Sequence, residues 1–128
     1  MSTLKQIFDV LKSNTEYDVF FPSQHKGNCI SPYYVVKADG ATTEVSISSE
    51  RPLYSILCYV PRNNYTTLEV MEEKAKKAMK QLFPMLMYAG NETTSFYDED
   101  IDGHMISFQY QACRKIIETD YMKIDRKE

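Results

Sequence analysis

The sequence predicts an α+β fold, in which a mostly antiparallel sheet of about four to five strands is packed by an N-terminal helix and a long central helix. Three segments predict it. Residues 53–60 are apolar on both faces of an extended chain, which is typical of a central strand. Residues 66–83 repeat apolar side chains at a spacing of three to four, which predicts a helix. Residues 105–113 alternate apolar and polar side chains, as a half-buried antiparallel strand does.

Length and composition indicate one domain, residues 1–117, followed by a charged tail at 118–128. The net charge of −3 argues against a dedicated nucleic-acid binder. No stretch is apolar and long enough to span a membrane, and the N-terminus has no secretion-signal pattern. The three cysteines are scattered without a CxxC motif, so we expect reduced thiols in a cytoplasm.

The N-terminal half begins with a helix through residue 12, which presents an apolar face, and continues with a short strand at 17–21 that ends at Pro22. Strands at 31–38 and 43–48 follow. The Asp39-Gly40 pair between them is a turn signal and predicts a hairpin, with a two-residue or longer loop left open. The strand at 53–60 then needs a cover on each face. Either the first helix or a neighbouring subunit supplies the second cover.

The central helix has the best-specified start in the chain. Thr66 and Glu69 match a capping box, and Tyr65 with Val70 match the hydrophobic staple that often accompanies it. Pro84 disfavours helical geometry at Phe83, so we expect the helix to end there. Three methionines near this end, Met79, Met85 and Met87, are interpreted as core filling in preference to the lining of a groove.

An acidic loop with five carboxylates and no base is predicted at 90–103, with a brief strand within 93–97. Asp98, Asp100 and Asp102, followed by a glycine, match the first half of an EF-hand calcium loop. The twelfth position is Gln109, where a bidentate Glu is needed, and a strand pattern follows where a helix should start. These three residues are therefore weak metal candidates, a solvated loop is preferred, and no cofactor is expected.

Other candidate chemistry is sparse. His25, Cys29 and His104 are too few and too scattered for a zinc site or a Cys–His nucleophile. Cys58 and Cys113 fall inside predicted strands, where inert buried thiols are common. The helix lysines at 74, 76, 77 and 80 alternate with glutamates, which indicates a solvated face and not a phosphate site. Because no nucleotide-binding loop is present either, we expect no enzyme.

Three segments carry a resemblance: Ser-Ile-Leu-Cys-Tyr-Val-Pro at 55–61, the helix from Thr66 to Phe83, and Ser-Phe-Gln-Tyr-Gln-Ala-Cys-Arg-Lys at 107–115. Together with the order of elements from the first helix to about Ile117, they resemble the tail terminator or tail completion proteins of tailed phages and of contractile phage-tail-like particles (tailocins). The likeness is one of element order and contains no catalytic signature.

The resemblance implies a structural virion protein. Such proteins form hexameric rings that cap the tail tube at its head-proximal end and offer the surface for a neck or head-completion protein. It implies assembly in the bacterial cytoplasm, a possible contact with a sheath, and DNA only in transit through the lumen. The acidic loop would then face that lumen, where like charge avoids trapping DNA.

The chain has ten tyrosines and no tryptophan, and tyrosine is frequent at interfaces. We expect the subunit interface to involve Tyr33, Tyr54, Arg51, Arg62, Asp98 and Glu99. Three alternatives remain open at this stage. One is a neck or head–tail joining subunit, one is a monomeric adaptor with a tyrosine patch, and one is a small hydrolase or metal enzyme that uses His25, Cys29 or His104.

Overall fold

The structure, a computed structural model, describes residues 3–43, 49–112 and 114–115. Its elements, in chain order, are α1 (Thr3–Asn14), β1 (Asp18–Phe20), β2 (Tyr33–Thr43), β3 (Ser49–Pro61), the 3₁₀ turn η1 (Arg62–Asn64), α2 (Thr67–Met79), the 3₁₀ turn η2 (Lys80–Leu82), β4 (Leu86–Gly90), β5 (Phe96–Asp98), β6 (Gly103–Ala112) and β7 (Arg114–Lys115). The expected α+β class is confirmed.

The strands form one sheet in the order β1-β2-β3-β6-β4, with β5 paired to β6 and β7 paired to β3. The β2–β3, β3–β6 and β4–β6 pairs are antiparallel, as expected. The β1–β2 pair is parallel, so the sheet is mixed. A parallel neighbour needs a crossover of about a dozen residues, and the polar segment 21–32 between these two strands supplies that length.

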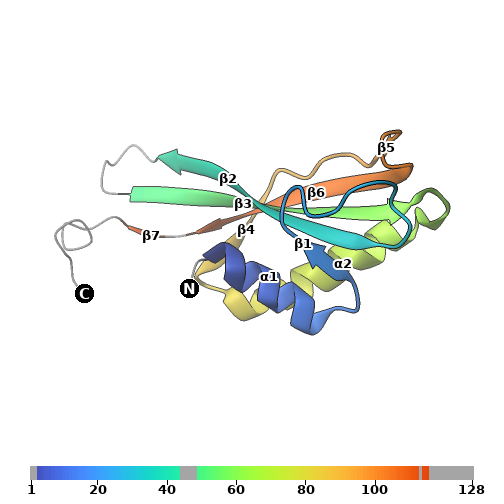
Figure 1. Cartoon of the computed structure of the whole chain (residues 1–128). Helices are drawn as coiled ribbons and strands as arrows, with labels where there is room; N and C mark the ends of the chain where they lie inside the picture. The colour runs from blue at the N-terminus through green and yellow to red at the C-terminus, as the bar shows by residue number, and fades with distance from the viewer. Residues whose placement is uncertain (1–2, 44–48, 113, 116–128) are drawn as a thin grey trace.

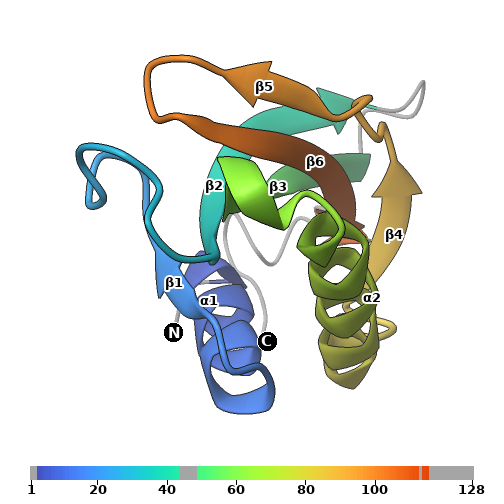
Figure 2. The same ribbon diagram turned by 90° about the vertical axis from the view of Figure 1, so that its right-hand side faces the viewer.

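Both helices lie on the same face of the sheet (Figures 1 and 2). Tyr34, Ile56 and Phe108 are fully buried between this face and the helices. From the helices, Ile7 and Leu11 of α1 and Met71 and Met79 of α2 complete the core. The first helix therefore covers the same side of β3 as the central helix. The second face of β3 has no helical cover within the described residues.

That second face is closed partly by aromatic stacking and partly by polar side chains. The loop after β1 places His25 on Tyr33 with a ring separation of 4.1 Å, and Tyr33 stacks on Tyr59 at 5.0 Å. Farther along the sheet, the Gln109 amide donates to the Asp39 carboxylate at 2.9 Å, and the hydroxyl of the buried Ser55 donates to the same carboxylate. The face is thus polar at its centre, which lets it meet water.

The predicted hairpin turn at Asp39-Gly40 is wrong. Strand β2 continues through these residues to Thr43, and its register with β3 shifts between Ala38 and Ala41. Gly40 has a φ of +85°, which glycine adopts without a steric penalty, so the turn signal marks a bulge. The strand expected at 43–48, the tail at 118–128 and Cys113 lie wholly or mostly outside the described residues.

The central helix is shorter than expected. Helix α2 ends at Met79, and η2 continues the chain to Leu82 before Phe83 turns to an extended conformation ahead of Pro84. The capping box does not form, because η1 leads directly into the helix and Thr66 already has helical backbone angles without a side-chain cap bond. The staple is absent too, since Tyr65 and Val70 are both exposed. The apolar stripe of the helix is nonetheless buried as predicted, at Leu68, Met71, Ala75 and Met79.

Candidate assembly interface

Exposed apolar side chains gather along one edge of the sheet. The described residues include nine large apolar side chains that are exposed, and six of them fall between residues 83 and 97. These six are Phe83, Met85, Met87, Tyr88, Phe96 and Tyr97. A concentration of this kind on a small domain marks an interaction surface better than scattered single residues do.

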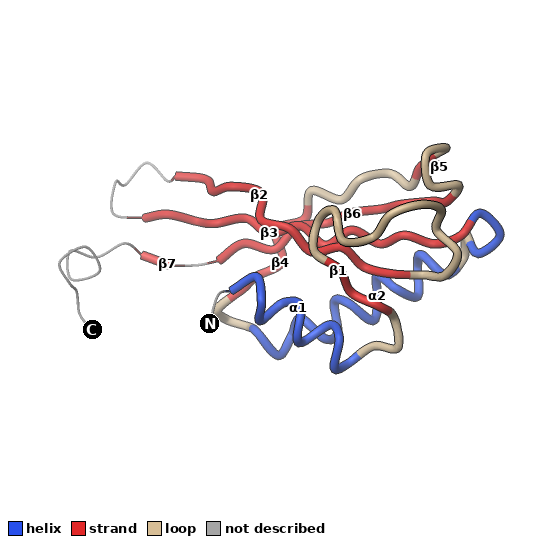
Figure 3. The backbone as a smooth tube through the Cα atoms, viewed as in Figure 1, coloured by secondary structure: helices blue, strands red, loops and turns tan. Residues whose placement is uncertain are grey.

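The edge consists of the two short strands β4 and β5 with a loop between them, as the backbone trace in Figure 3 shows. Strand β6 pairs with β3 on one side, while β4 and β5 both pair with its other side. Strand β4 lies beside residues 109–112 of β6 and β5 beside residues 103–105. Between them, the Thr93 N–H donates to the Ser107 carbonyl at 3.0 Å. Residues 86–98 therefore form an outer edge of the sheet, with backbone groups that can accept a further strand.

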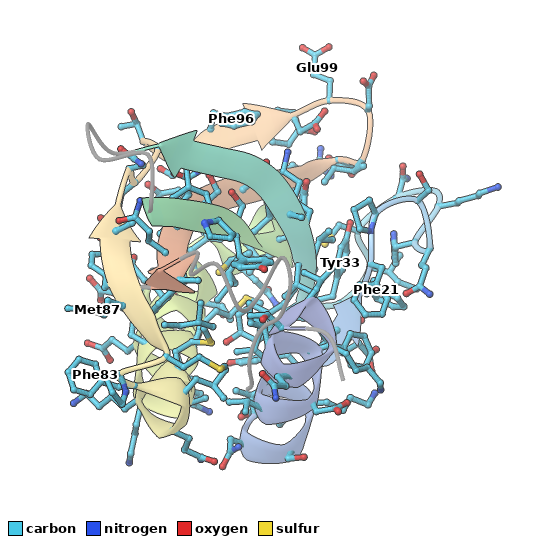
Figure 4. All side chains as sticks on the ribbon, turned by 90° about the vertical axis from the view of Figure 1, so that its left-hand side faces the viewer. Phe21, Tyr33, Phe83, Met87, Phe96 and Glu99 are labelled. Carbon is cyan, nitrogen blue, oxygen red and sulfur yellow. The ribbon has the colours of Figure 1, made fainter. Side chains whose placement is uncertain are left out.

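A groove of about 380 Å³ lies at the β4 end of this edge, between α2 and the sheet. It is lined by Lys76, Met79, Lys80, Phe83, Leu86, Met87, Tyr88 and Tyr110. Leu86 and Met79 are buried in its floor, whereas Phe83 is 63% exposed at its rim. Figure 4 shows Phe83 and Met87 projecting outward from this side of the molecule. The groove is mainly apolar, with lysine at its border.

The wall of the groove is held by contacts to Tyr88. Its ring packs edge-on against Tyr110 at 5.5 Å, and the Lys76 ammonium lies 4.6 Å from its centre. Its hydroxyl donates to Glu92, which also accepts from Lys76 at 2.9 Å. The bonds from Tyr88 and Lys76 lower the pKa of Glu92. Burial acts to lower the pKa of Lys76, but its bonds to Glu72 and Glu92 outweigh burial and raise it. These contacts within one chain hold the Tyr88 ring in place at the wall of the groove.

The β5 end of the edge carries aromatic and acidic side chains next to each other. Phe96 and Tyr97 are exposed, and Glu99 and Asp100 follow them at the tip of the loop before β6. Tyr97 packs against His104 at 5.4 Å and donates its hydroxyl to Asp102. Figure 4 shows Phe96 and Glu99 at the opposite end of the view from Phe83.

The structure does not assemble the calcium-like arrangement. Within the described residues no three His, Cys, Asp or Glu side chains lie close enough together to hold a metal ion. The Asp98 carboxylate accepts the N–H of Asp100 at 3.0 Å, and Asp102 accepts from Tyr97 and lies 3.7 Å from Arg62. Asp102 also adopts a φ of +51°, where the chain turns into β6. The acidic residues shape and cap a turn.

The expected interface residues lie in different environments. Tyr33 is 4% exposed, so its ring stabilises the chain itself and offers no free surface. Tyr54 is half-buried against the core. Arg51 pairs through its backbone with Thr42 in the β2–β3 ladder. Arg62 and Glu99 are exposed and Asp98 is half-buried. Of the expected set, Asp98 and Glu99 adjoin the apolar edge, and Arg62 lies near its β5 end through Asp102, which bonds Tyr97.

The candidate nucleophiles and zinc ligands do not form a site. Burial raises the pKa of the Cys29 thiol to about 11, and its Sγ donates to the Ser31 carbonyl. Cys58 is fully buried in the core, and burial raises its pKa. His25 stacks on Tyr33, and His104 lies between Tyr65 and Tyr97. These residues pack within the fold.

Sequence reasoning missed strand β4. Met85 and Met87, interpreted as core filling, are 41% and 42% exposed on the edge, and only Met79 is buried. A usable signal was present, because after Pro84 the chain alternates: Leu86 faces inward between two exposed methionines. The three methionines do not form one cluster, because Pro84 separates the last two from the helix.

No protein-family model matches the chain, and a comparison with curated proteins finds no match. Among the described residues, no helix has the length and apolar character needed to cross a membrane.

Proposed function

We propose that this chain is a structural assembly subunit that forms a closed ring, caps a phage tail tube as a tail terminator, and presents a surface to a neck or head-completion protein. The proposed partners are other copies of the chain and the tube protein. The proposed place is the head-proximal end of a virion tail or phage-tail-like particle, reached after assembly in the bacterial cytoplasm.

The observation that carries this proposal is the apolar edge at residues 83–97. Its two exposed clusters lie at different ends of one strand-like edge, one beside Lys80 and the other beside Glu99. A subunit in a cyclic ring needs two different surfaces that fit each other, so that each copy contacts one neighbour through each surface. An edge with two chemically distinct ends is suited to this requirement.

A second feature supports contact with a larger assembly. The paired ends of β2 and β3 project beyond the helical layer as a narrow arm (Figure 1), with β7 paired to β3 at its far end. The backbone pairing of the arm runs from Tyr54 opposite Ala38 to Glu50 opposite Thr43. An isolated two-stranded ribbon is marginally stable in water, and among the described residues only the two-residue strand β7 adds to this one, so the arm gains from a surface to lie on. We assign the tube to that role.

The test uses tail tubes polymerised from the major tube protein of the same genome. The purified chain is mixed with the tubes and viewed by negative-stain electron microscopy. The proposal predicts ring-shaped density at one end of each tube and a halt to further tube growth when tube monomers are added. Tubes that stay uncapped and continue to grow at saturating protein would overturn it.

A further inference from the structure

We infer that the lysine-bordered groove at the β4 end of one copy receives the aromatic and acidic segment 96–100 at the β5 end of the next copy. This inference names the contact within the ring and therefore rests on the proposed function. The occupant of the groove is a second copy of this chain, because the chemistry of the two surfaces is complementary.

The border of the groove and segment 96–100 carry opposite charges. Lys80, which lines the groove at the start of η2, is exposed and forms no ion pair with any described residue. At the other end, Glu99 and Asp100 are exposed and likewise form no ion pair within the described part of the chain. Lys74 and Lys76, in contrast, are already engaged by Glu16, Glu72 and Glu92. Within the described residues, one cation without an ion pair thus borders the groove, and two anions without one follow the exposed aromatic pair.

The apolar groove also matches the exposed aromatic pair of segment 96–100 in character and size. The groove exposes more apolar than polar lining and is large enough for one or two aromatic side chains. Phe96 is 48% exposed and Tyr97 is 40% exposed, immediately before the acids. Seating this pair in the groove would place the following carboxylates toward Lys80 at its border. One short segment therefore matches both properties of the groove.

The groove and segment 96–100 lie at opposite ends of the edge in one copy. Leu86 pairs with Ala112 at one end of β6, and Asp98 pairs with Gly103 at the other. Nine residues of strand separate these pairs, which is about 30 Å. The two surfaces cannot meet within one copy, so the contact joins two copies head to tail. A head-to-tail contact whose rotation closes forms a ring, which is the arrangement proposed here.

The experiment uses charge reversal on the full-length chain. Variant A carries Lys80→Glu, and variant B carries Glu99→Lys and Asp100→Lys. Each variant alone opposes like charges at every contact, so we expect each to be monomeric by native mass spectrometry at a concentration where the unmodified chain forms rings. Lys77→Glu, on the α1 side of α2, and Glu73→Lys change exposed residues outside the contact, so they are matched controls and should leave the ring intact.

Mixing the variants gives the decisive result. The acidic groove of A fits the basic segment of B, and the basic groove of B fits the acidic segment of A. A 1:1 mixture should therefore form rings that alternate A and B, and the two reversals combined in one chain should also restore the ring. Circular dichroism of each variant checks that a monomer is folded. Folded variants that assemble alone as well as the unmodified chain would overturn the contact.

The outcomes separate this contact from the proposed function. If the chain caps tubes but A and B assemble and cap normally, the contact is wrong, the tail function stands, and the acidic loop is free to face the lumen. If assembly follows the charges but tubes are never capped, the contact stands and the tail function is wrong. If the chain associates neither in solution nor on tubes, both are wrong.

Discussion

The Lys76 ammonium lies 4.6 Å from the centre of the Tyr88 ring and 2.9 Å from a carboxylate oxygen of Glu92, so one side chain of α2 fixes the edge strand and the segment after it. The same ammonium bonds Glu72 at 2.7 Å on its own helix. The groove of the proposed interface therefore depends on a contact between two elements that are separate in sequence.

Replacing Lys76 by methionine should loosen this wall. Methionine retains much of the apolar stem but loses two ion pairs and the cation–π contacts with Tyr88 and Phe108, which we expect to lower the free energy of unfolding by about 1 kcal/mol. Urea denaturation would measure the change. Lys77→Met is the matched control, because Lys77 is exposed on the same helix without an ion pair in the described structure, and it should shift the midpoint far less. Equal shifts would contradict the role given to Lys76.

Gly103 is required for packing at the start of β6. A Cβ atom there would lie 2.6 Å from the Val60 carbonyl oxygen and 3.1 Å from Cys29 Cβ. Since the backbone carbonyl cannot move aside without disturbing the β3–β6 ladder, Gly103→Ala should cost about 1–3 kcal/mol. Thermal unfolding would report it.

Adding Cys29→Gly, which removes the Cβ atom in contact, to Gly103→Ala should not rescue stability, because the closest atom is the Val60 carbonyl oxygen. Restoration by that second change would show that the thiol residue, and not the backbone, makes the site tight.

Tyr34 joins the sheet to α2 through one buried bond. Its hydroxyl donates to the Met71 carbonyl at 2.7 Å, and the side chain is fully buried. Tyr34→Phe keeps the ring and removes the donor, so we expect a loss of about 1 kcal/mol in chemical denaturation. Tyr17→Phe changes a partly buried ring that packs edge-on against Tyr34 and serves as the control. A Tyr34 variant as stable as the parent would mean that this bond adds nothing net.

Stability should fall at alkaline pH. Burial raises the pKa of Cys29 from its usual 9 to about 11 and that of Tyr110 from 10 to about 12. Both groups are acids that lose their proton more easily in the unfolded chain, so their contribution is complete below pH 9 and is lost as pH rises from 9 to 12. Cys29→Ala should reduce the loss between pH 9 and 11, to which Cys58 and Tyr110 also contribute, and unfolding midpoints across that range would measure the change. An unchanged pH dependence in that variant would contradict the burial argument for Cys29.

The spacing of apolar residues predicts those helices and strands that have one buried face. The apolar stripe of α2 and the alternation of β6 each fix a buried face, and both are as expected. The acidic loop is also where the sequence placed it. The class of fold follows from these periodicities, because a two-residue repeat gives one apolar face only in a strand and a three-to-four-residue repeat only in a helix.

The remaining features depend on contacts distant in sequence. The parallel β1–β2 pair is set by how the crossover folds over Tyr33, and the Gly40 bulge by the partner strand β3. Thr66 and Glu69 have the chemistry of a cap, but η1 brings the chain into the helix already turned. Likewise, the exposure of Met87 depends on β4 being an edge strand, which no local pattern states.

Native mass spectrometry of the purified full-length chain, repeated after incubation with tail tubes, tests the central claim most directly. We predict a single closed ring, six copies by the tail-terminator resemblance, either free or on tube ends. The ring should weaken as salt is raised from about 0.1 to 1 M, because the exposed charges of the contact are then screened. A chain that remains monomeric at high concentration and on tubes would contradict the account.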